Sequence, residues 1–152
     1  MKRKYIINLI LLLMLSSCGF TPIYKEFKNK QFNFNITEIN GNDEMNNFTI
    51  IQLNSYSNNS SDKIYDLKIN TDYSKSILSK NLVGEVTNYL LVTKIEFEII
   101  NLEINNKFLF QDETKTENIS NKLELKNYEK SVINNFITSA IKEFVLKIST
   151  AE

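Results

Sequence analysis

The side chain best placed to do chemistry in this sequence is the thiol of Cys18, the only cysteine among 152 residues. It ends the segment Leu15-Ser16-Ser17-Cys18, which follows a basic start at Lys2-Arg3-Lys4 and an apolar run from Tyr5 to Leu15. A basic start, a short apolar run and small residues before a cysteine are typical of a bacterial lipoprotein signal peptide. Lipidation and cleavage would make Cys18 the first residue of the mature protein and attach it to a membrane.

Three other interpretations of this segment fit less well. As a helix, the 11 residues from Tyr5 to Leu15 would rise only about 16 Å, roughly half the thickness of a bilayer's hydrocarbon core. An ordinary secretory signal usually ends in an Ala-x-Ala-like site, whereas two serines precede Cys18. A run that is apolar on every side at the start of a chain is rarely a buried core helix. The residues therefore favour the lipoprotein signal.

Few other side chains could carry out catalysis. The chain has no histidine, and lipidation would use its single thiol. This excludes the usual zinc sites and the Ser-His and Cys-His nucleophiles. Two carboxylate pairs remain, Glu96 with Glu98 and Asp112 with Glu113. Residues two apart in a strand share one face, and a solvated face is the simplest place for Glu96 and Glu98. We therefore expect neither enzymatic activity nor a bound cofactor or metal.

Charge and length describe one small, mildly acidic domain. The 18 basic and 18 acidic side chains of the whole chain balance, but residues 1–17 hold three of the basic ones, so their removal leaves a net charge of −3. No basic cluster remains, and a nucleic-acid-binding surface is not expected. We predict a signal peptide at residues 1–17, a lipidated tether at 18–31 and a single domain at 32–152 that has no disulfide to stabilise it.

The residues after the tether predict a strand followed by a helix. Apolar and polar side chains alternate from Phe32 to about Ile39, as in a half-buried strand. Asp43 is expected to cap a helix from Glu44 to Tyr56, although the same stretch also allows a strand. A polar loop is predicted from Asn54 to Asp62. The apolar side chains expected on the buried face of the helix are Met45, Phe48 and Ile51.

Two long strands are predicted in the middle of the chain. Apolar and polar residues alternate from Tyr65 to Tyr73 and again from Tyr89 to Ile99. Beyond Ile99 the apolar phase moves by one residue, which indicates a bulge or a turn. The residues that carry the apolar pattern after this shift are Ile100, Leu102 and Ile104.

A hairpin is predicted next. Asn105-Asn106 is a suitable turn, because asparagine tolerates a positive φ. The strand after it contains Phe108 and Phe110 and is expected to fade into the polar stretch from Gln111 to Lys122.

The last element is predicted to be a long amphipathic helix. Apolar residues recur at spacings of three and four from Leu125 to Ile148. We expect this stripe to pack on the sheet, since a membrane-surface helix would have a more cationic polar face. Because strands and helices do not alternate, we predict an α+β fold with two helices on one face of a roughly four-stranded, mostly antiparallel sheet. The stripe consists of Leu125, Tyr128, Val132, Ile133, Phe136, Ile137, Ala140, Ile141, Phe144, Val145 and Ile148.

The start of the predicted mature chain resembles a known family. Its first residues, Cys18-Gly19-Phe20-Thr21-Pro22-Ile23-Tyr24, are similar to the opening of the LptE-type lipopolysaccharide-assembly lipoproteins, where Cys-Gly-Phe-x-Pro-Leu-Tyr is frequent. Ile23 replaces the leucine of that pattern. The order of elements is similar over the rest of the chain, while residues 111–122 and the first helix are less like the family. The resemblance implies an LptE-like α+β sandwich and rests on Cys18, Gly19, Phe20, Pro22 and Tyr24.

The resemblance also implies a location and partners. LptE-type proteins lie at the periplasmic face of the outer membrane, largely within the lumen of the β-barrel LptD, where they act as plug and assembly partner and bind lipopolysaccharide. Gly19 agrees with this location, since aspartate there is the usual inner-membrane retention signal. Another outer-membrane lipoprotein adaptor, serving barrel assembly or a transport complex, is the alternative; a lipid-anchored hydrolase is disfavoured because no nucleophile motif is present. Loose candidates for lipid contact, for which a solvated surface is the simpler interpretation, are Lys63, Lys68, Lys107, Lys115 and Lys122.

Overall fold

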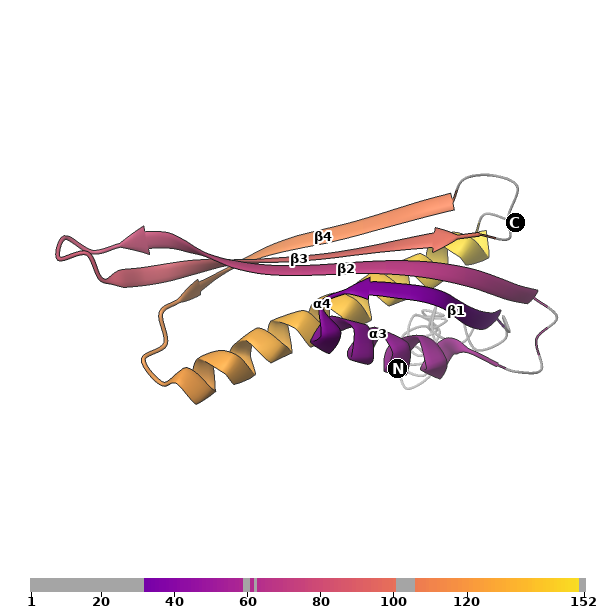
Figure 1. Cartoon of the computed structure of the whole chain (residues 1–152), viewed down its shortest axis with the longest axis horizontal. Coiled ribbons are helices and arrows are strands. Elements are labelled where there is room, and N and C mark those ends of the chain that lie inside the picture. Colours follow the sequence, from indigo (N-terminus) through magenta and orange to yellow (C-terminus); the bar gives the residue numbers. More distant parts are fainter. Residues whose placement is uncertain (1–31, 59–60, 62, 101–105, 151–152) are drawn as a thin grey trace, which may run out of the picture. The chain divides into compact units, whose positions relative to one another are not determined.

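Two helices lie against the same face of a four-stranded sheet (Figure 1). The computed structural model describes residues 32–58, 61, 63–100 and 106–150. The predicted α+β class, with its order of strand, helix, three strands and helix, is confirmed. The elements are β1 (Phe32–Gly41), α3 (Asp43–Tyr56), β2 (Lys63–Lys80), β3 (Val86–Ile99), β4 (Asn106–Glu117) and α4 (Lys122–Thr150).

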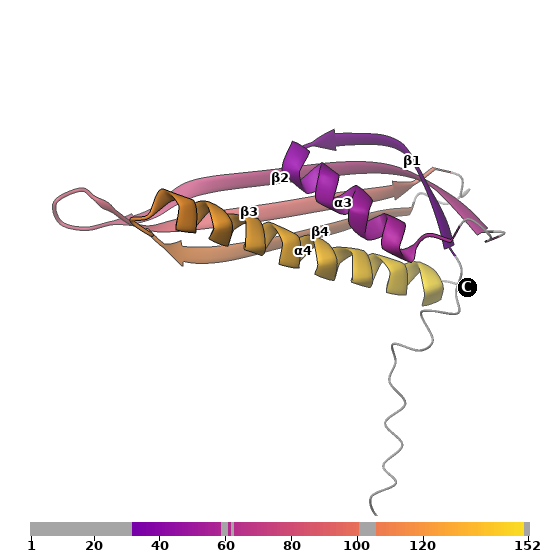
Figure 2. The same cartoon turned by 90° about the horizontal axis from the view of Figure 1, so that it is seen from below.

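The strands lie in the sheet in the same order as in the chain, β1-β2-β3-β4. β1 and β2 are parallel, because α3 carries the chain back along the sheet between them, whereas β2, β3 and β4 form two antiparallel hairpins. The sheet is therefore mostly antiparallel, as predicted, with one parallel pair at the β1 edge. Figure 2 shows α3 and α4 side by side across the sheet.

The junction between β1 and α3 depends on Gly41. This residue has a φ of +109°, in the left-handed region that favours glycine. A Cβ atom here would collide with the backbone of Thr71 in β2. The next residue, Asn42, accepts a 3.0 Å hydrogen bond from the backbone N–H of Met45 through its side chain. Asn42 is therefore the cap of α3, and the prediction of Asp43 was wrong by one residue, since Asp43 is already the first residue of the helix.

The buried face of α3 also differs from the prediction. Met45 is buried as expected, but Ile51 is 64% exposed. The side chains that complete the buried face are Thr49 and Leu53, both fully buried and four residues apart on the helix. Phe48 is half-buried, and Thr49, as a polar residue, was not part of the predicted apolar face. Apolar spacing alone therefore selected a face rotated away from the true one.

The last hairpin of the sheet is longer than predicted. β3 ends at Ile99 as the phase shift indicated, and residues 101–105 lie outside the described part of the chain. Asn106 pairs with Ile99 in the sheet, so it belongs to β4 and not to a turn. β4 then continues to Glu117. The polar stretch that was expected to end the strand is therefore mostly strand, because threonines at positions 114 and 116 replace apolar residues on its helix-facing side.

The core lies between α4 and the sheet and is rich in phenylalanine. Phe144 of α4 stacks on Phe97 of β3 with ring centroids 4.5 Å apart, and Phe108 of β4 meets the same ring edge-on at 5.2 Å. Phe34 of β1 lies 6.1 Å from it. One helix position therefore contacts three of the four strands. The predicted stripe of α4 is buried from Ile133 onward, but Tyr128 near the start of the helix is 38% exposed.

Candidate functional site

The lipidation motif and the family-like opening of the mature chain lie outside the residues that the structure describes. This holds for Leu15, Ser16, Ser17 and Cys18 and for Gly19, Phe20, Pro22 and Tyr24, so their predicted roles stay predictions. The structure bears on the remaining candidates, which are the carboxylate pairs and the five lysines. It also shows two surfaces that the sequence did not predict.

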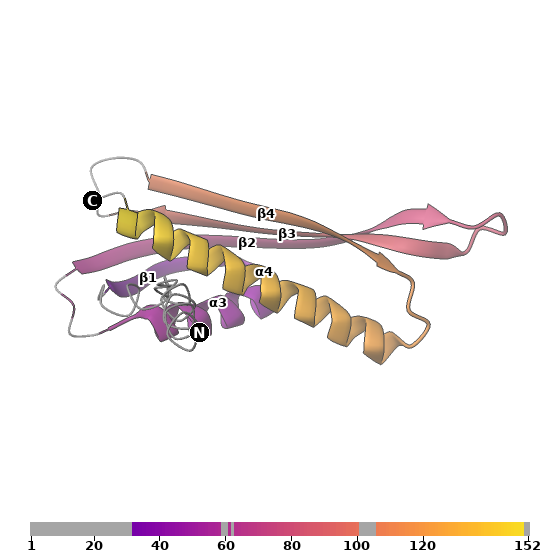
Figure 3. The same ribbon diagram turned by 180° about the vertical axis from the view of Figure 1, so that it is seen from behind.

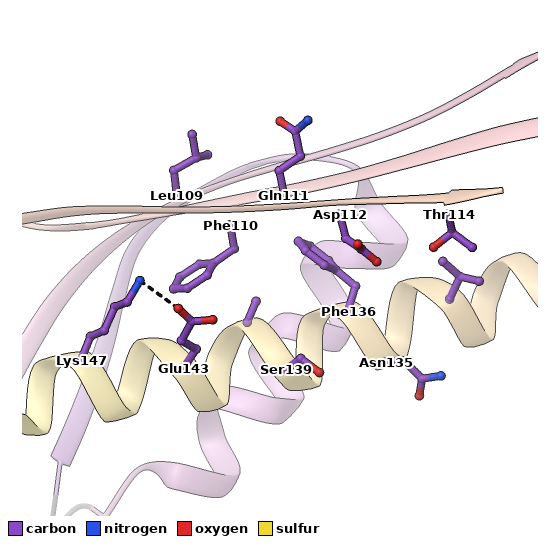
Figure 4. A pocket seen from close by; sticks show the side chains of 12 residues that line it. Leu109, Phe110, Gln111, Asp112, Thr114, Asn135, Phe136, Ser139, Glu143 and Lys147 are labelled. Carbon is purple, nitrogen blue, oxygen red and sulfur yellow. Dashed lines mark ion pairs between the residues drawn. The ribbon is translucent and has the colours of Figure 1, made fainter.

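The carboxylate pairs do not converge into an acid–base site. Glu96 and Glu98 share the sheet face that points away from the helices, and Lys107 of β4 forms ion pairs with them at 3.9 and 3.4 Å. Asp112 and Glu113 are neighbours in β4 and therefore point to opposite faces. Figure 4 shows Asp112 directed toward α4. Within the described residues, no group of three histidine, cysteine, aspartate or glutamate side chains could hold a metal ion.

Two of the candidate lysines belong to a row of charges that crosses the outer face of the sheet. In register order, Glu38 of β1 pairs with Lys68 of β2, Lys68 with Glu98 of β3, and Glu98 with Lys107 of β4. Lys68 contacts Glu38 at 3.4 Å. The side-chain amide of Asn40, and then the Lys68 ammonium, lower the pKa of the Glu38 carboxyl. Each of these lysines therefore lies between carboxylates and forms no cationic patch.

The other three lysines are exposed and dispersed. Lys63 is the first residue of β2, Lys122 the first residue of α4, and Lys115 lies in β4 opposite Leu90. The prediction that these cations are solvated is confirmed, and no common site contains all five lysines. An anionic ligand would therefore meet single charges, which bind weakly at a solvated surface.

A groove of about 510 Å³ runs between β4 and α4 and was not predicted (Figure 4). β4 is an edge strand, so one side of the groove is open. Phe110 and Phe136 form part of its apolar floor, and Asp112 points into it, while Leu109 and Gln111 point away from the helix. In the sequence, only the polar residues on the helix-facing side of β4 indicate that α4 and β4 are not closely packed there.

A charged pair lines one end of the groove. Lys147 and Glu143 of α4 lie 2.9 Å apart, and the Lys147 ammonium lies 4.9 Å above the ring of Phe110. Asp112 places a charge on the helix-facing side of an edge strand. A charge in that position discourages pairing with a further strand. The groove is therefore a poor site for an added β-strand.

The second surface is the tip of the β2–β3 hairpin, which extends beyond the other two strands and the helices (Figure 3). Its turn runs from Asn81 to Glu85. The exposed apolar side chains of this tip are Ile77, Leu78, Leu82 and Val83. Adjacent apolar residues at 77–78 and 82–83 break the alternation of a half-buried strand, and this signal in the sequence could have identified the tip.

Comparisons with known proteins show that the fold is similar to that of solved structures. Family models yield no match to the sequence, and no curated protein matches it either. Among solved structures, rare lipoprotein B from Shewanella oneidensis is similar with a TM-score of 0.59 and 12% identity, over 80% of this chain and 98% of that one. Lipoprotein B from Nitrosomonas europaea has a TM-score of 0.52 and 14% identity, over 78% of this chain and 83% of that one. A minor lipoprotein from Acinetobacter baumannii has a TM-score of 0.51 and 12% identity, over 74% and 92%.

The chain therefore has a fold that bacterial lipoproteins share. In the described part of the chain, no helix is both long and apolar enough to cross a membrane. At these identities the likeness extends to the fold and not to residues or partners.

Proposed function

We propose that this protein is an outer-membrane lipoprotein that acts as plug and assembly partner of an LptD-like β-barrel in lipopolysaccharide transport. The observation that carries the proposal is the combination of the signal ending at Cys18 with a fold found in three bacterial lipoproteins. The motif and the fold are separate observations, since the motif lies outside the residues that the structure describes.

The barrel partner is supported by the resemblance of residues 18–24 to the start of LptE-type proteins and by the surface of the sheet. The lumen of a β-barrel is polar. The outer face of the sheet offers it the alternating charges of Glu38, Lys68, Glu98 and Lys107. Because each charge already has a neighbour of opposite sign, such a face can meet a polar wall without leaving an unpaired charge.

Affinity purification tests the partner. A C-terminally tagged, lipidated protein is solubilised in mild detergent and captured, and an unrelated outer-membrane lipoprotein with the same tag serves as the control bait. The proposal expects a large β-barrel protein and lipopolysaccharide in the first eluate only. Recovery of barrel-assembly components without lipopolysaccharide would instead support the adaptor that the sequence left as the alternative.

Depletion of the protein tests the pathway. If it works with the translocon, its loss should leave lipopolysaccharide in the periplasm and reduce the amount of mature barrel partner. An adaptor for general barrel assembly would lower many outer-membrane barrels together. Unchanged lipopolysaccharide at the cell surface after depletion would contradict the proposed function.

A further inference from the structure

The tip of the β2–β3 hairpin, residues 77–86, carries a group of apolar side chains that are exposed to solvent. Leu82 and Val83 at its apex are 108% and 78% exposed, and Ile77 and Leu78 behind them are 53% and 44% exposed. A folded protein in water usually scatters exposed apolar residues singly, whereas a group of them marks a surface that contacts something else. Here four such side chains lie within ten residues of chain.

The turn at this apex satisfies four of its backbone N–H groups within itself. The side-chain oxygen of Asn81 accepts hydrogen bonds from the backbone N–H groups of Val83 at 3.1 Å and Glu85 at 2.9 Å. The backbone N–H of Gly84 donates to the carbonyl of Asn81 at 3.0 Å, and that of Asn81 donates to the carbonyl of Glu85 at 2.9 Å. Irregular backbone tolerates a water-free surrounding only when its polar groups are bonded internally. The N–H groups of Asn81, Val83, Gly84 and Glu85 meet this requirement, which lowers the cost of a shallow entry of the apex.

The composition of the tip favours lipid over protein as the contacting partner. Between Lys75 and Lys94 the only charged residues are Lys80 and Glu85, one of each sign. Residues 77–86 contain neither an aromatic residue nor an arginine, which are the residues that dominate protein–protein hot spots. Lys80 and Glu85 flank the apex by two residues, so they lie only about 7 Å behind it along the strands. An apolar apex with one lysine and one glutamate behind it suits a shallow entry below the lipid headgroups. The apolar stem of Lys80 can extend so that its charge stays in water.

We infer that, in the protein that is not bound to a barrel partner, Leu82 and Val83 enter the apolar layer of the bilayer that holds the protein's own lipid anchor. The inference rests on the lipidation of Cys18 in the proposed function and does not depend on the barrel partner. Thirteen residues separate Cys18 from Phe32, a tether that spans at most about 45 Å when extended. Phe32 pairs with Lys63 at the start of β2, so the tip lies at the other end of this 18-residue strand, about 60 Å from the end of the tether. The tether keeps the domain near the membrane, and the apolar tip would hold the far end of the domain there.

A single fluorophore at the apex tests the insertion. Cys18 is the only cysteine and would carry the lipid, so Val83→Cys supplies one free thiol for a polarity-sensitive dye such as NBD. The lipidated protein is reconstituted in phosphatidylethanolamine and phosphatidylglycerol vesicles that contain brominated acyl chains. The matched control is Ile51→Cys on α3, an apolar residue with 64% exposure. We expect the dye at position 83 to be quenched several times more strongly than the dye at position 51, with emission shifted to shorter wavelength.

A second variant separates insertion from a local effect of the dye. Adding Leu82→Asn to Val83→Cys should return quenching to the level of the control. The urea midpoint should stay unchanged, because Leu82 is fully exposed. Equal, weak quenching at positions 51 and 83 would overturn the inference. So would a dye at position 83 that becomes protected only when the purified barrel partner is added, since a protein would then be the occupant. These vesicles contain neither the barrel nor lipopolysaccharide, so the result is independent of the affinity purification.

Discussion

At the scale of single residues, the contact between Gly41 and Thr71 fixes how α3 leaves the sheet. The Thr71 hydroxyl accepts a 3.0 Å hydrogen bond from the N–H of Asn42 and lies 2.7 Å from the side-chain oxygen of Asn46, to which it donates. Thr71 is 5% exposed. A buried hydroxyl that is both donor and acceptor costs little, whereas a lost partner would leave a polar group unpaired. The hydrogen bonds of the Thr71 hydroxyl therefore hold the start of α3 against β2.

Replacement of this glycine is the first prediction. Gly41→Ala should lower the free energy of unfolding by about 2 kcal/mol or more, because the methyl group adds the strain of a positive φ and collides with the backbone of Thr71. Gly84→Ala is the control, since Gly84 has a φ of +87° with no atom within 4 Å of the added methyl group. It should cost about 1 kcal/mol. Urea unfolding measures both, and equal losses would show that the collision with Thr71 is relieved.

The second prediction concerns the hydroxyl of Tyr73. Burial, followed by the carboxylate of Glu129, raises the pKa of this phenol well above its ordinary range. The unfolded chain loses that proton near its ordinary pKa of about 10, while the folded protein still holds it. The contribution to stability is therefore complete below about pH 10 and is lost as the pH rises further.

Tyr73→Phe removes the titrating group, so its urea midpoint should fall less than that of the wild type between about pH 9 and pH 11. Tyr128→Phe is the control, because Tyr128 is 38% exposed and its loss should leave the alkaline decline as it is. A decline of the same size in Tyr73→Phe and in the wild type would contradict the assignment.

At the scale of elements, the sequence predicted those whose buried faces are made of apolar residues. β3 buries Leu91, Ile95, Phe97 and Ile99 in strict alternation, and its face and its end were both predicted. α4 was predicted from its stripe, which is buried over its last five turns. In both elements the apolar residues are the buried ones, so the hydrophobic pattern is sufficient to predict the element and its buried face.

The prediction failed where polar residues occupy buried or strand positions. Thr49 in α3 and Thr116 in β4 are both buried, and neither contributes to an apolar pattern. β2 extends past Tyr73 to Lys80 through polar and exposed residues, because pairing with β3 and not burial keeps it extended. The groove and the hairpin tip depend on these same extensions. Hydrogen bonding across the sheet therefore determines how far these strands extend, which the alternation of apolar and polar residues did not predict.

The packing of α4 on the sheet gives the third prediction. Phe144 is fully buried and contacts Phe97, Phe108 and Phe34. Phe144→Ala should therefore lower the free energy of unfolding by about 3 to 5 kcal/mol, a loss that can unfold so small a domain. Leu146→Ala is the control on the same helix, since Leu146 is 41% exposed. Urea unfolding should show only a small change for it, and a loss as large as that of Phe144→Ala would mean that α4 is buried on both sides.

At the scale of the whole molecule, the core and the proposed membrane anchor lie in different parts of the chain. The core is built from residues 32–150, and its packing needs no disulfide, since the only cysteine is Cys18. The proposed function assigns membrane attachment to a lipid at Cys18, for which each buried methylene contributes about 0.8 kcal/mol. Several acyl chains there would hold the protein far more tightly than any surface contact of the domain. Removal of the anchor should separate stability from membrane attachment.

Cys18→Ala is the fourth prediction, made in a protein exported by an ordinary cleavable signal in place of residues 1–17. Because the core begins at Phe32, the urea midpoint should stay unchanged while the protein moves from the membrane to the soluble periplasmic fraction. The wild type, analysed by mass spectrometry, should carry acyl chains on its first residue, and an unmodified Cys18 there would refute the anchor. If the variant still sediments with membranes, the β-barrel partner is holding it, and depletion of the barrel should then release it. Attachment that survives both the substitution and the depletion would contradict the anchor and the barrel as the two sources of membrane binding.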